Sequence, residues 1–171
     1  KIWEAAEPAL LEFKSSKYLS DYAEENGFKV TKGVAEIPTA FIAEYGSGRP
    51  IIGIMGEFDA NPGISQKKQP TKEPLVKGAA GHGCGHNLFG TASLGAAIAI
   101  KEQIEKGNIK GTVIFYGTPA EETIFAKVWM VREGLFDKLD VCMDWHPGDE
   151  IQAGTQSSKA LVDFRVIFHG N

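Results

Sequence analysis

Several features that mark common classes of protein are scarce or missing in this sequence. The chain has only two cysteines, Cys84 and Cys142, which lie far apart; a disulfide between them stays open, but two such cysteines are more often thiols or ligands. No apolar run reaches the ~20 residues that a helix needs to cross a bilayer. No Lys/Arg run stands out, and the net charge is −4, which argues against nucleic acid as a partner. We therefore expect a cytoplasmic protein with no membrane or nucleic-acid partner.

Length and composition are those of an ordinary globular domain. The chain has 171 residues, of which 43% are hydrophobic and 23% are charged, enough for one domain with a proper core. The sequence does not begin with Met, has no hydrophobic signal core, and begins within a helical pattern. It ends at the close of a strand-like run. We expect a piece of a longer protein.

Alternating strand and helix patterns predict an α/β fold with a largely parallel sheet. The predicted elements are a helix over 3–26, strands over 28–34, 40–45 and 51–55, a helix from Asn87 to Lys106, a strand over 112–116, a helix over 125–133, and strands over 141–145 and 159–168. Gly27 and Gly107 are the expected helix ends, and Asn87 the expected N-cap. The long stretch 61–83 has little periodicity, and such loops are usually functional or disordered.

Polar side chains gather in four segments near the predicted strand ends, where α/β proteins place their sites. The first holds Glu57 and Asp59, which face the same way on an extended chain. A buried carboxylate there needs a partner or a metal. We expect Asp59 to be functional, and Glu57 to do no more than cap the following loop.

The second segment, GHGCGHN (81–87), puts two of the four histidines beside a cysteine. Thiolate and neutral imidazole are good ligands for zinc-like ions, and the flanking glycines let the backbone kink so that Cys84 and His86 reach one centre or two neighbouring ones. His82 is a less favoured third ligand, because ligands from one short loop crowd each other. A glycine-rich turn with incidental Cys and His is the alternative.

The third and fourth segments add carboxylates and one more imidazole. Glu121 and Glu122 follow a strand and point in different directions, so one could bind metal while the other takes a proton from water. Alternatively, they only open the next helix, whose N-terminus favours acids. His146 ends a short strand before a proline, and a lone histidine is more often structural than a ligand. Together, however, Cys84, His86, one Glu of the pair and His146 form a coherent ligand set.

The motifs GEFDANPG (56–63), GHGCGHN (81–87), PAEE (119–122) and WHPGD (145–149) occur in an order that resembles the M20 metallopeptidase family. The resemblance covers nearly all of the chain. It is closest to the amidohydrolase branch that contains aminobenzoyl-glutamate hydrolases, N-acyl-amino-acid amidohydrolases and Xaa-Arg dipeptidase-like proteins. Asn87, where other members of the branch carry Asp, favours the aminobenzoyl-glutamate side.

This resemblance implies a site and a fold. Cys84, His86, Glu122 and His146 would be the ligands of two divalent metal ions, zinc or manganese. Glu121 would be the general base and later the acid, and Asp59 would orient a ligand. The fold would be the three-layer α/β fold of zinc peptidases, also called phosphorylase/hydrolase-like, incomplete at its C-terminus. The reaction would be hydrolysis of an amide between an acyl or aminoacyl group and an amino acid.

The resemblance also implies what lies outside these residues. Family members are more than twice as long and carry a lid and dimerisation domain and a further histidine ligand. We expect residues 1–156 to be the N-terminal part of the catalytic domain and residues 157–171 to contain the first strand of the lid domain. The whole protein would be a homodimer acting on a small acyl-amino-acid or dipeptide substrate, and this chain alone would be poorly active or inactive.

Two other interpretations stay open. One is a non-catalytic metal-binding scaffold, although a scaffold has no need of a base beside a ligand. The other is a thiol enzyme that uses Cys84 with His82 or His86, which should survive removal of metal.

Overall fold

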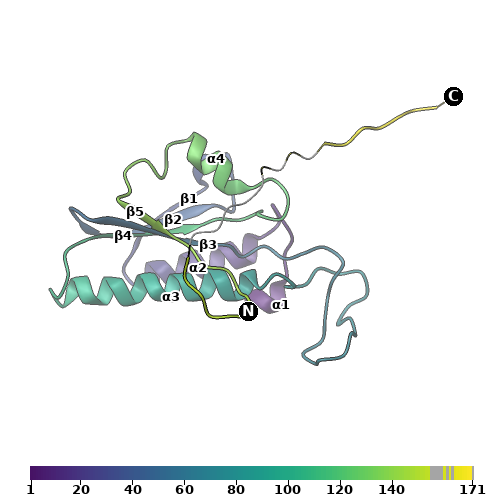
Figure 1. The fold of residues 1–171 in the computed structure, drawn as a ribbon, viewed down its shortest axis with the longest axis horizontal. Helices are drawn as coiled ribbons and strands as arrows, with labels where there is room; N and C mark the ends of the chain where they lie inside the picture. The colour runs from purple at the N-terminus through teal and green to yellow at the C-terminus, as the bar shows by residue number, and fades with distance from the viewer. Residues whose placement is uncertain (155–159, 161, 163, 171) are drawn as a thin grey trace.

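A mixed sheet with helices on both faces forms the body of the protein (Figure 1). The computed structural model describes residues 1–154, 160, 162 and 164–170. Its elements are α1 (Ile2–Ala5), α2 (Phe13–Glu25), β1 (Lys29–Lys32), the 3₁₀ helix η1 (Val34–Glu36), β2 (Phe41–Ser47), β3 (Ile51–Gly56), α3 (His86–Glu105), β4 (Gly111–Gly117), α4 (Ala126–Arg132) and β5 (Val141–Met143). Helices α2 and α3 cover one face and α4 the other, which confirms the predicted three-layer α/β class.

The direction of the strands fixes where a site can form. The strand order is β1-β2-β4-β3-β5. Strands β1 and β2 and strands β2 and β4 pair antiparallel, whereas β3 runs parallel to both β4 and β5. The carboxyl ends of β3, β4 and β5 therefore meet at one edge of the sheet, the edge at which α/β proteins bind ligands.

The core lies on both faces of β4, every residue of which is buried. Val113 and Phe115 pack in the cluster that includes Leu94 of α3. Ile114 and Tyr116 pack on the opposite face with Met130 of α4. This alternation is the period of two that a strand buried on both faces must satisfy with apolar residues.

The predicted single helix over 3–26 is wrong, because the chain breaks between α1 and α2. Ala6 has a left-handed backbone with φ 40°, and Pro8 follows, which has no N–H to donate. The carboxylate of Glu7 then accepts hydrogen bonds from the backbone N–H groups of Lys14 (3.0 Å) and Ser15 (2.8 Å). A side chain within the break, between α1 and α2, thus caps the start of α2.

The start of α3 also differs from the expectation. Asn87 is not the N-cap; the helix begins at His86, after Gly85 with φ 83°. A Cβ at Gly85 would lie 2.8 Å from Pro147 Cγ, so glycine is required both by conformation and by space. The expected helix ends are confirmed, since Gly27 and Gly107 have φ 83° and 71° directly after α2 and α3.

The two irregular regions of the chain differ in how well they were predicted. The stretch 61–83 has no helix or strand, as expected, and its ends are joined by a bridge between Asn61 and Gly81. The predicted strand over 159–168 is absent from its described residues 160, 162 and 164–168, while 159, 161 and 163 lie outside the described part. Phe164 and Phe168 are 79% and 90% exposed, so these apolar side chains are not part of the core. Among the described residues, no helix has the length and apolar character to span a membrane.

Candidate metal centre

The four predicted segments converge at the carboxyl edge of β3, β4 and β5. Asp59 follows β3, Glu121 and Glu122 follow β4, and His146 follows β5. His86 reaches the same place from the first residue of α3. The parallel arrangement of the three strands is what brings these distant residues together.

His86 is fully buried and held by two carboxylates. Its Nδ1 donates a hydrogen bond to Asp59 Oδ1 at 2.9 Å, and its Nε2 lies 2.9 Å from Glu57 Oε2. Burial lowers the pKa of the ring, but the hydrogen bond to Asp59 and the contact with Glu57 outweigh it and raise the pKa to about 10. Because Nδ1 is occupied, Nε2 is the ring atom left to bind a metal in place of its proton.

His146 is tethered in the same way. Its Nδ1 donates to the carbonyl of the next residue, Pro147, at 2.9 Å, which leaves Nε2 directed at Cys84 Sγ, 3.2 Å away. The rings of His86 and His146 lie edge to face with centroids 5.6 Å apart. The neighbouring Trp145 donates from Nε1 to Ser93 Oγ (3.1 Å) on α3, which fixes the segment after β5 against the helix.

Cys84 sits in the glycine-rich turn before α3. Its backbone N–H donates to Asn61 Oδ1 at 3.1 Å, so the irregular stretch 61–83 is tied to the turn. Burial, together with the nearby carboxylates of Glu122, Glu121 and Glu57, raises the pKa of the thiol to about 11. A nucleophilic cysteine needs the opposite shift, which argues against a thiol enzyme.

Glu121 and Glu122, here called the acid pair, follow β4. They come directly after Ala120, whose backbone is left-handed with φ 56°. The backbone N–H of Glu122 donates a hydrogen bond to Asp59 Oδ2 at 3.0 Å. Asp59 therefore binds both the imidazole ring of His86 and the backbone of this turn. Glu121 Oε2 and Glu122 Oε1 each lie 3.9 Å from His86 Nε2. The pair forms a turn and does not open α4, which begins only at Ala126. Burial and the charge of Glu57 raise the pKa of Glu121.

Three buried polar atoms at this edge suit a cation. His86 Nε2, Glu122 Oε1 and Glu57 Oε2 lack any hydrogen-bond partner of correct geometry within the described chain. Such orphaned atoms are rare in proteins and need an explanation. Donor atoms of Cys84, His86 and His146 lie within 4.8 Å of one another, as do those of Glu57, His86 and Glu121. Sulfur, imidazole and carboxylate are the donors that zinc-like ions take, so the residues fit such a metal.

Three residues at the centre were not found by sequence reasoning: Glu57, Lys127 and Glu12. Glu57 does not merely cap a loop, because it is 5% exposed, contacts His86 and forms an ion pair with Lys127 of α4. Burial raises the pKa of Glu57, but His86 and Lys127 outweigh it and lower the pKa below its usual range. Glu12, at the start of α2, is fully buried against the turn at Ala120. Of these three residues, only Lys127 had a signal in the sequence, because it is a basic residue shortly after Glu121 and Glu122. No sequence pattern indicated the roles of Glu57 and Glu12.

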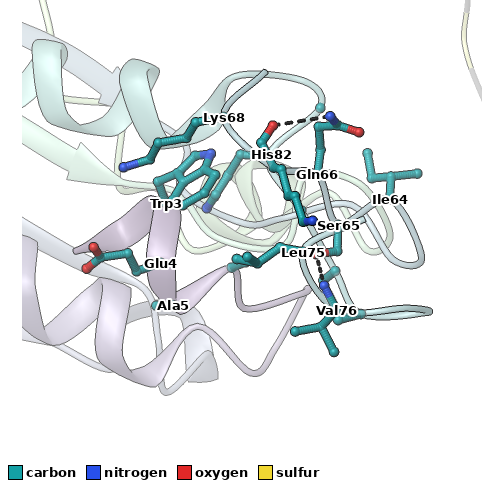
Figure 2. Close-up of a pocket in the computed structure, with 16 residues that line it drawn as sticks. Trp3, Glu4, Ala5, Ile64, Ser65, Gln66, Lys68, Leu75, Val76 and His82 are labelled. Atoms are coloured by element: carbon teal, nitrogen blue, oxygen red, sulfur yellow. Dashed lines mark hydrogen bonds between the residues drawn. The ribbon is translucent and has the colours of Figure 1, made fainter. Parts of the chain in front are cut away.

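His82 does not join either group of donors. Its ring Nε2 donates to the carbonyl of Ile2 at 3.1 Å, and burial lowers its pKa. His82 lines a cavity of about 340 Å³ between α1 and the stretch 61–83, where Lys68 Nζ lies 4.6 Å from the ring centre of Trp3 (Figure 2). The cavity also adjoins Gly81 and Gly83, directly before Cys84.

Comparison with known proteins assigns the chain to a family. Residues 53–163 match the model of peptidase family M20/M25/M40. The chain belongs to this family. It is 45% identical over 169 residues to one of the p-aminobenzoyl-glutamate hydrolase subunits of Escherichia coli (strain K12), which covers 97% of this chain and 34% of that protein. It is 30% identical over 185 residues to human Xaa-Arg dipeptidase, covering 99% of this chain and 38% of that protein.

Solved structures of family M20 agree with the fold. The Bacillus subtilis YXEP protein, described as a dinuclear metal binding peptidase from the M20 family, matches with a TM-score of 0.66 and 26% identity over 80% of this chain and 37% of its own. An aminobenzoyl-glutamate utilization protein from Klebsiella pneumoniae matches with a TM-score of 0.60 over 86% of this chain and 41% of its own, at 16% identity, and supports the fold alone. The chain thus spans 34% to 38% of the length of the two curated relatives.

Proposed function

We propose that the whole protein containing this chain is a metal-dependent amidohydrolase. It would hydrolyse an amide between an acyl or aminoacyl group and an amino acid. The observation that carries the proposal is the pair of tethered imidazoles: His86 and His146 both commit Nδ1 to an acceptor and turn Nε2 towards Cys84 or the acid pair. That arrangement is typical of metal-binding histidines.

Cys84, His86, Glu122 and His146 would hold two divalent ions, zinc or manganese. When bound, the ions would polarise the amide carbonyl and acidify an attacking water. Asp59 would keep His86 in the correct orientation and fix the backbone of Glu122, since its two oxygens bind these two groups.

Glu121 would take the proton of the water and return it to the leaving amine. Its side chain is 30% exposed, so a substrate can reach it, and the raised pKa of its carboxyl makes it a better proton acceptor than an ordinary carboxylate. Replacing this carboxylate by an amide removes the proton acceptor and preserves the shape of the side chain.

The names of the relatives guide the choice of substrates. They favour aminobenzoyl-glutamate first, then N-acyl amino acids and dipeptides. Residues 1–156 would be the N-terminal part of the catalytic domain, and residues 157–171 the entry into a lid domain through which the whole protein dimerises. Both cysteines are free thiols, which is in keeping with a cytoplasmic protein.

The deciding experiment compares Glu121→Gln with the unchanged whole protein. Turnover of these substrates should fall about 10²- to 10⁴-fold, the usual contribution of a general base, with metal content unchanged. Glu133→Gln, at an exposed acid after α4, is the matched control and should keep full activity. Equal turnover in Glu121→Gln would contradict the assignment of the base.

Two outcomes would select the alternatives. Bound metal without turnover of any tested substrate would favour a metal-binding scaffold. Activity that survives a chelator would favour the thiol enzyme, although the ring that faces Cys84 is His146 and not His82 or His86.

A further inference from the structure

Glu57 uses its two carboxylate oxygens in different ways. Oε1 forms an ion pair with Lys127 Nζ on α4. Oε2 lies 2.9 Å from His86 Nε2, but the direction is unsuitable for a hydrogen bond, and the oxygen has no other partner in the described chain. One oxygen is thus satisfied, and the other faces the atom of His86 that would bind metal.

An oxygen without a hydrogen bond in this position is costly. The side chain of Glu57 is 6% exposed and that of His86 is fully buried, so water does not readily replace the missing partner. A buried polar atom without a hydrogen bond is destabilising, because it has lost its contact with water and gained no bond in exchange. A carboxylate kept only for its ion pair with Lys127 would have no reason to present the second oxygen to a buried imidazole.

The negative charges around Glu57 also indicate that a cation binds here. Asp59, Glu121 and Glu122 all lie at the same edge as Glu57, and donor atoms of Glu57 and Glu121 lie within 4.8 Å of each other. Repulsion within such a group must be offset by cations. Among the described residues, Lys127 is the only Lys or Arg that forms an ion pair with one of these four acids, so it offsets one charge only.

We propose that Glu57 is a further metal-facing carboxylate of the centre, and that Lys127 offsets the charge of Glu57 in the metal-free protein. Lys127 holds Oε1 and leaves Oε2 for the cation that replaces the proton of His86. The inference rests on the proposed metal centre and extends its donor set. Because Lys127 and the metal ion compete for the same charge, changing Glu57 and changing Lys127 should act on metal affinity in opposite directions.

The test measures metal binding directly in the whole protein. Equilibrium dialysis against Zn²⁺ or Mn²⁺ alone, with bound metal counted by mass spectrometry, gives stoichiometry and affinity; melting temperatures are recorded with and without metal. The variants are Glu57→Gln, which keeps size and an acceptor for Lys127, and Lys127→Met. Glu44→Gln is the matched control, because it breaks an ion pair with Lys138 in which the two side chains are 37% and 48% exposed.

Glu57→Gln should weaken the binding of at least one ion tenfold or more, within the 10- to 100-fold range seen when groups that support a metal are lost. Lys127→Met should lower the melting temperature of the metal-free protein, since a buried charge loses its partner, yet bind metal as tightly as the unchanged protein or more tightly. Glu44→Gln should leave affinity unchanged.

Three outcomes would overturn the inference. Unchanged affinity in Glu57→Gln, beside an unchanged protein that binds metal, removes Glu57 from the centre while the proposed function stands. Weaker metal binding in Lys127→Met means that the pair is structural, and this variant decides if Glu57→Gln does not fold. Absence of metal from the unchanged protein overturns the proposed function and this inference together.

Discussion

Glu12 is a fully buried carboxylate that binds the backbone directly before Glu121 and Glu122. Its Oε1 accepts a hydrogen bond from Ala120 N (2.9 Å), and its Oε2 accepts one from Thr39 Oγ1 (3.1 Å). Ala120 is left-handed and directly precedes Glu121. At the scale of single residues, the centre therefore depends on carboxylates that bind no metal but fix the backbone that presents the ligands.

The buried position of Glu12 gives the stability of the protein a predictable pH dependence. Burial, with the charge of Asp59, raises the pKa of Glu12 above the ordinary 4.5. The stability contributed by the protonated group is complete below about pH 4.5 and is lost as the pH rises through the folded-state pKa. Glu12→Gln has no such loss, so its stability relative to the unchanged protein should increase as the pH rises above about 4.5 and through the raised pKa of Glu12.

Urea unfolding at a series of pH values measures this difference. Glu25→Gln on the same helix is the matched control, because Glu25 is exposed, and its substitution should leave the pH profile unchanged. A Glu12→Gln profile parallel to that of the unchanged protein would show that the carboxylate is ionised without cost in the folded state.

At the scale of elements, the close packing of α3 on β3 requires glycine at position 90. A Cβ at Gly90 would lie 2.6 Å from the backbone oxygen of Glu57, whereas a Cβ at Gly95 on the same helix would meet nothing within 4 Å. Helix α3 thus approaches the end of β3 more closely than any side chain would allow, and this approach brings His86 to Glu57 and Asp59.

These two glycines provide a matched pair of substitutions. Gly95→Ala should stabilise the protein by about 0.5–1 kcal/mol, the usual gain in helix propensity. Gly90→Ala should destabilise it by about 1–3 kcal/mol through overpacking against rigid backbone and should weaken metal binding. Chemical denaturation measures the stability of each variant, and metal titration measures its metal affinity. Equal effects of the two substitutions would contradict the claim that Gly90 is needed for the close approach of α3 to β3.

Sequence patterns predicted most elements because their signals are local. The apolar runs over 40–45, 51–55 and 112–116 correspond to β2, β3 and β4, and glycine marked the ends of α2 and α3. The break before α2 was missed because Glu7, within the predicted helix, leaves it and caps N–H groups seven and eight positions further along the chain. The last predicted strand depended on alternation alone, and a strand also needs a partner for its backbone.

At the scale of the whole molecule, ordered motifs identified the family and named residues that do lie together. Cys84, His86 and His146 converge within 4.8 Å, and Asp59 touches both His86 and Glu122. The roles of Glu57, Lys127 and Glu12 could not be predicted in this way. Glu57 pairs with Lys127, 70 positions away, and Glu12 binds Ala120, 108 positions away, and only the folded chain defines such contacts.

The most direct test of the account is a structure of the whole protein loaded with zinc or manganese, with the ions located by anomalous scattering. We predict two ions at the carboxyl edge of β3, β4 and β5, held by Cys84, His86, Glu122 and His146 at about 2.0–2.3 Å. Ions bound elsewhere, or a loaded protein with no anomalous density at this edge, would contradict the account.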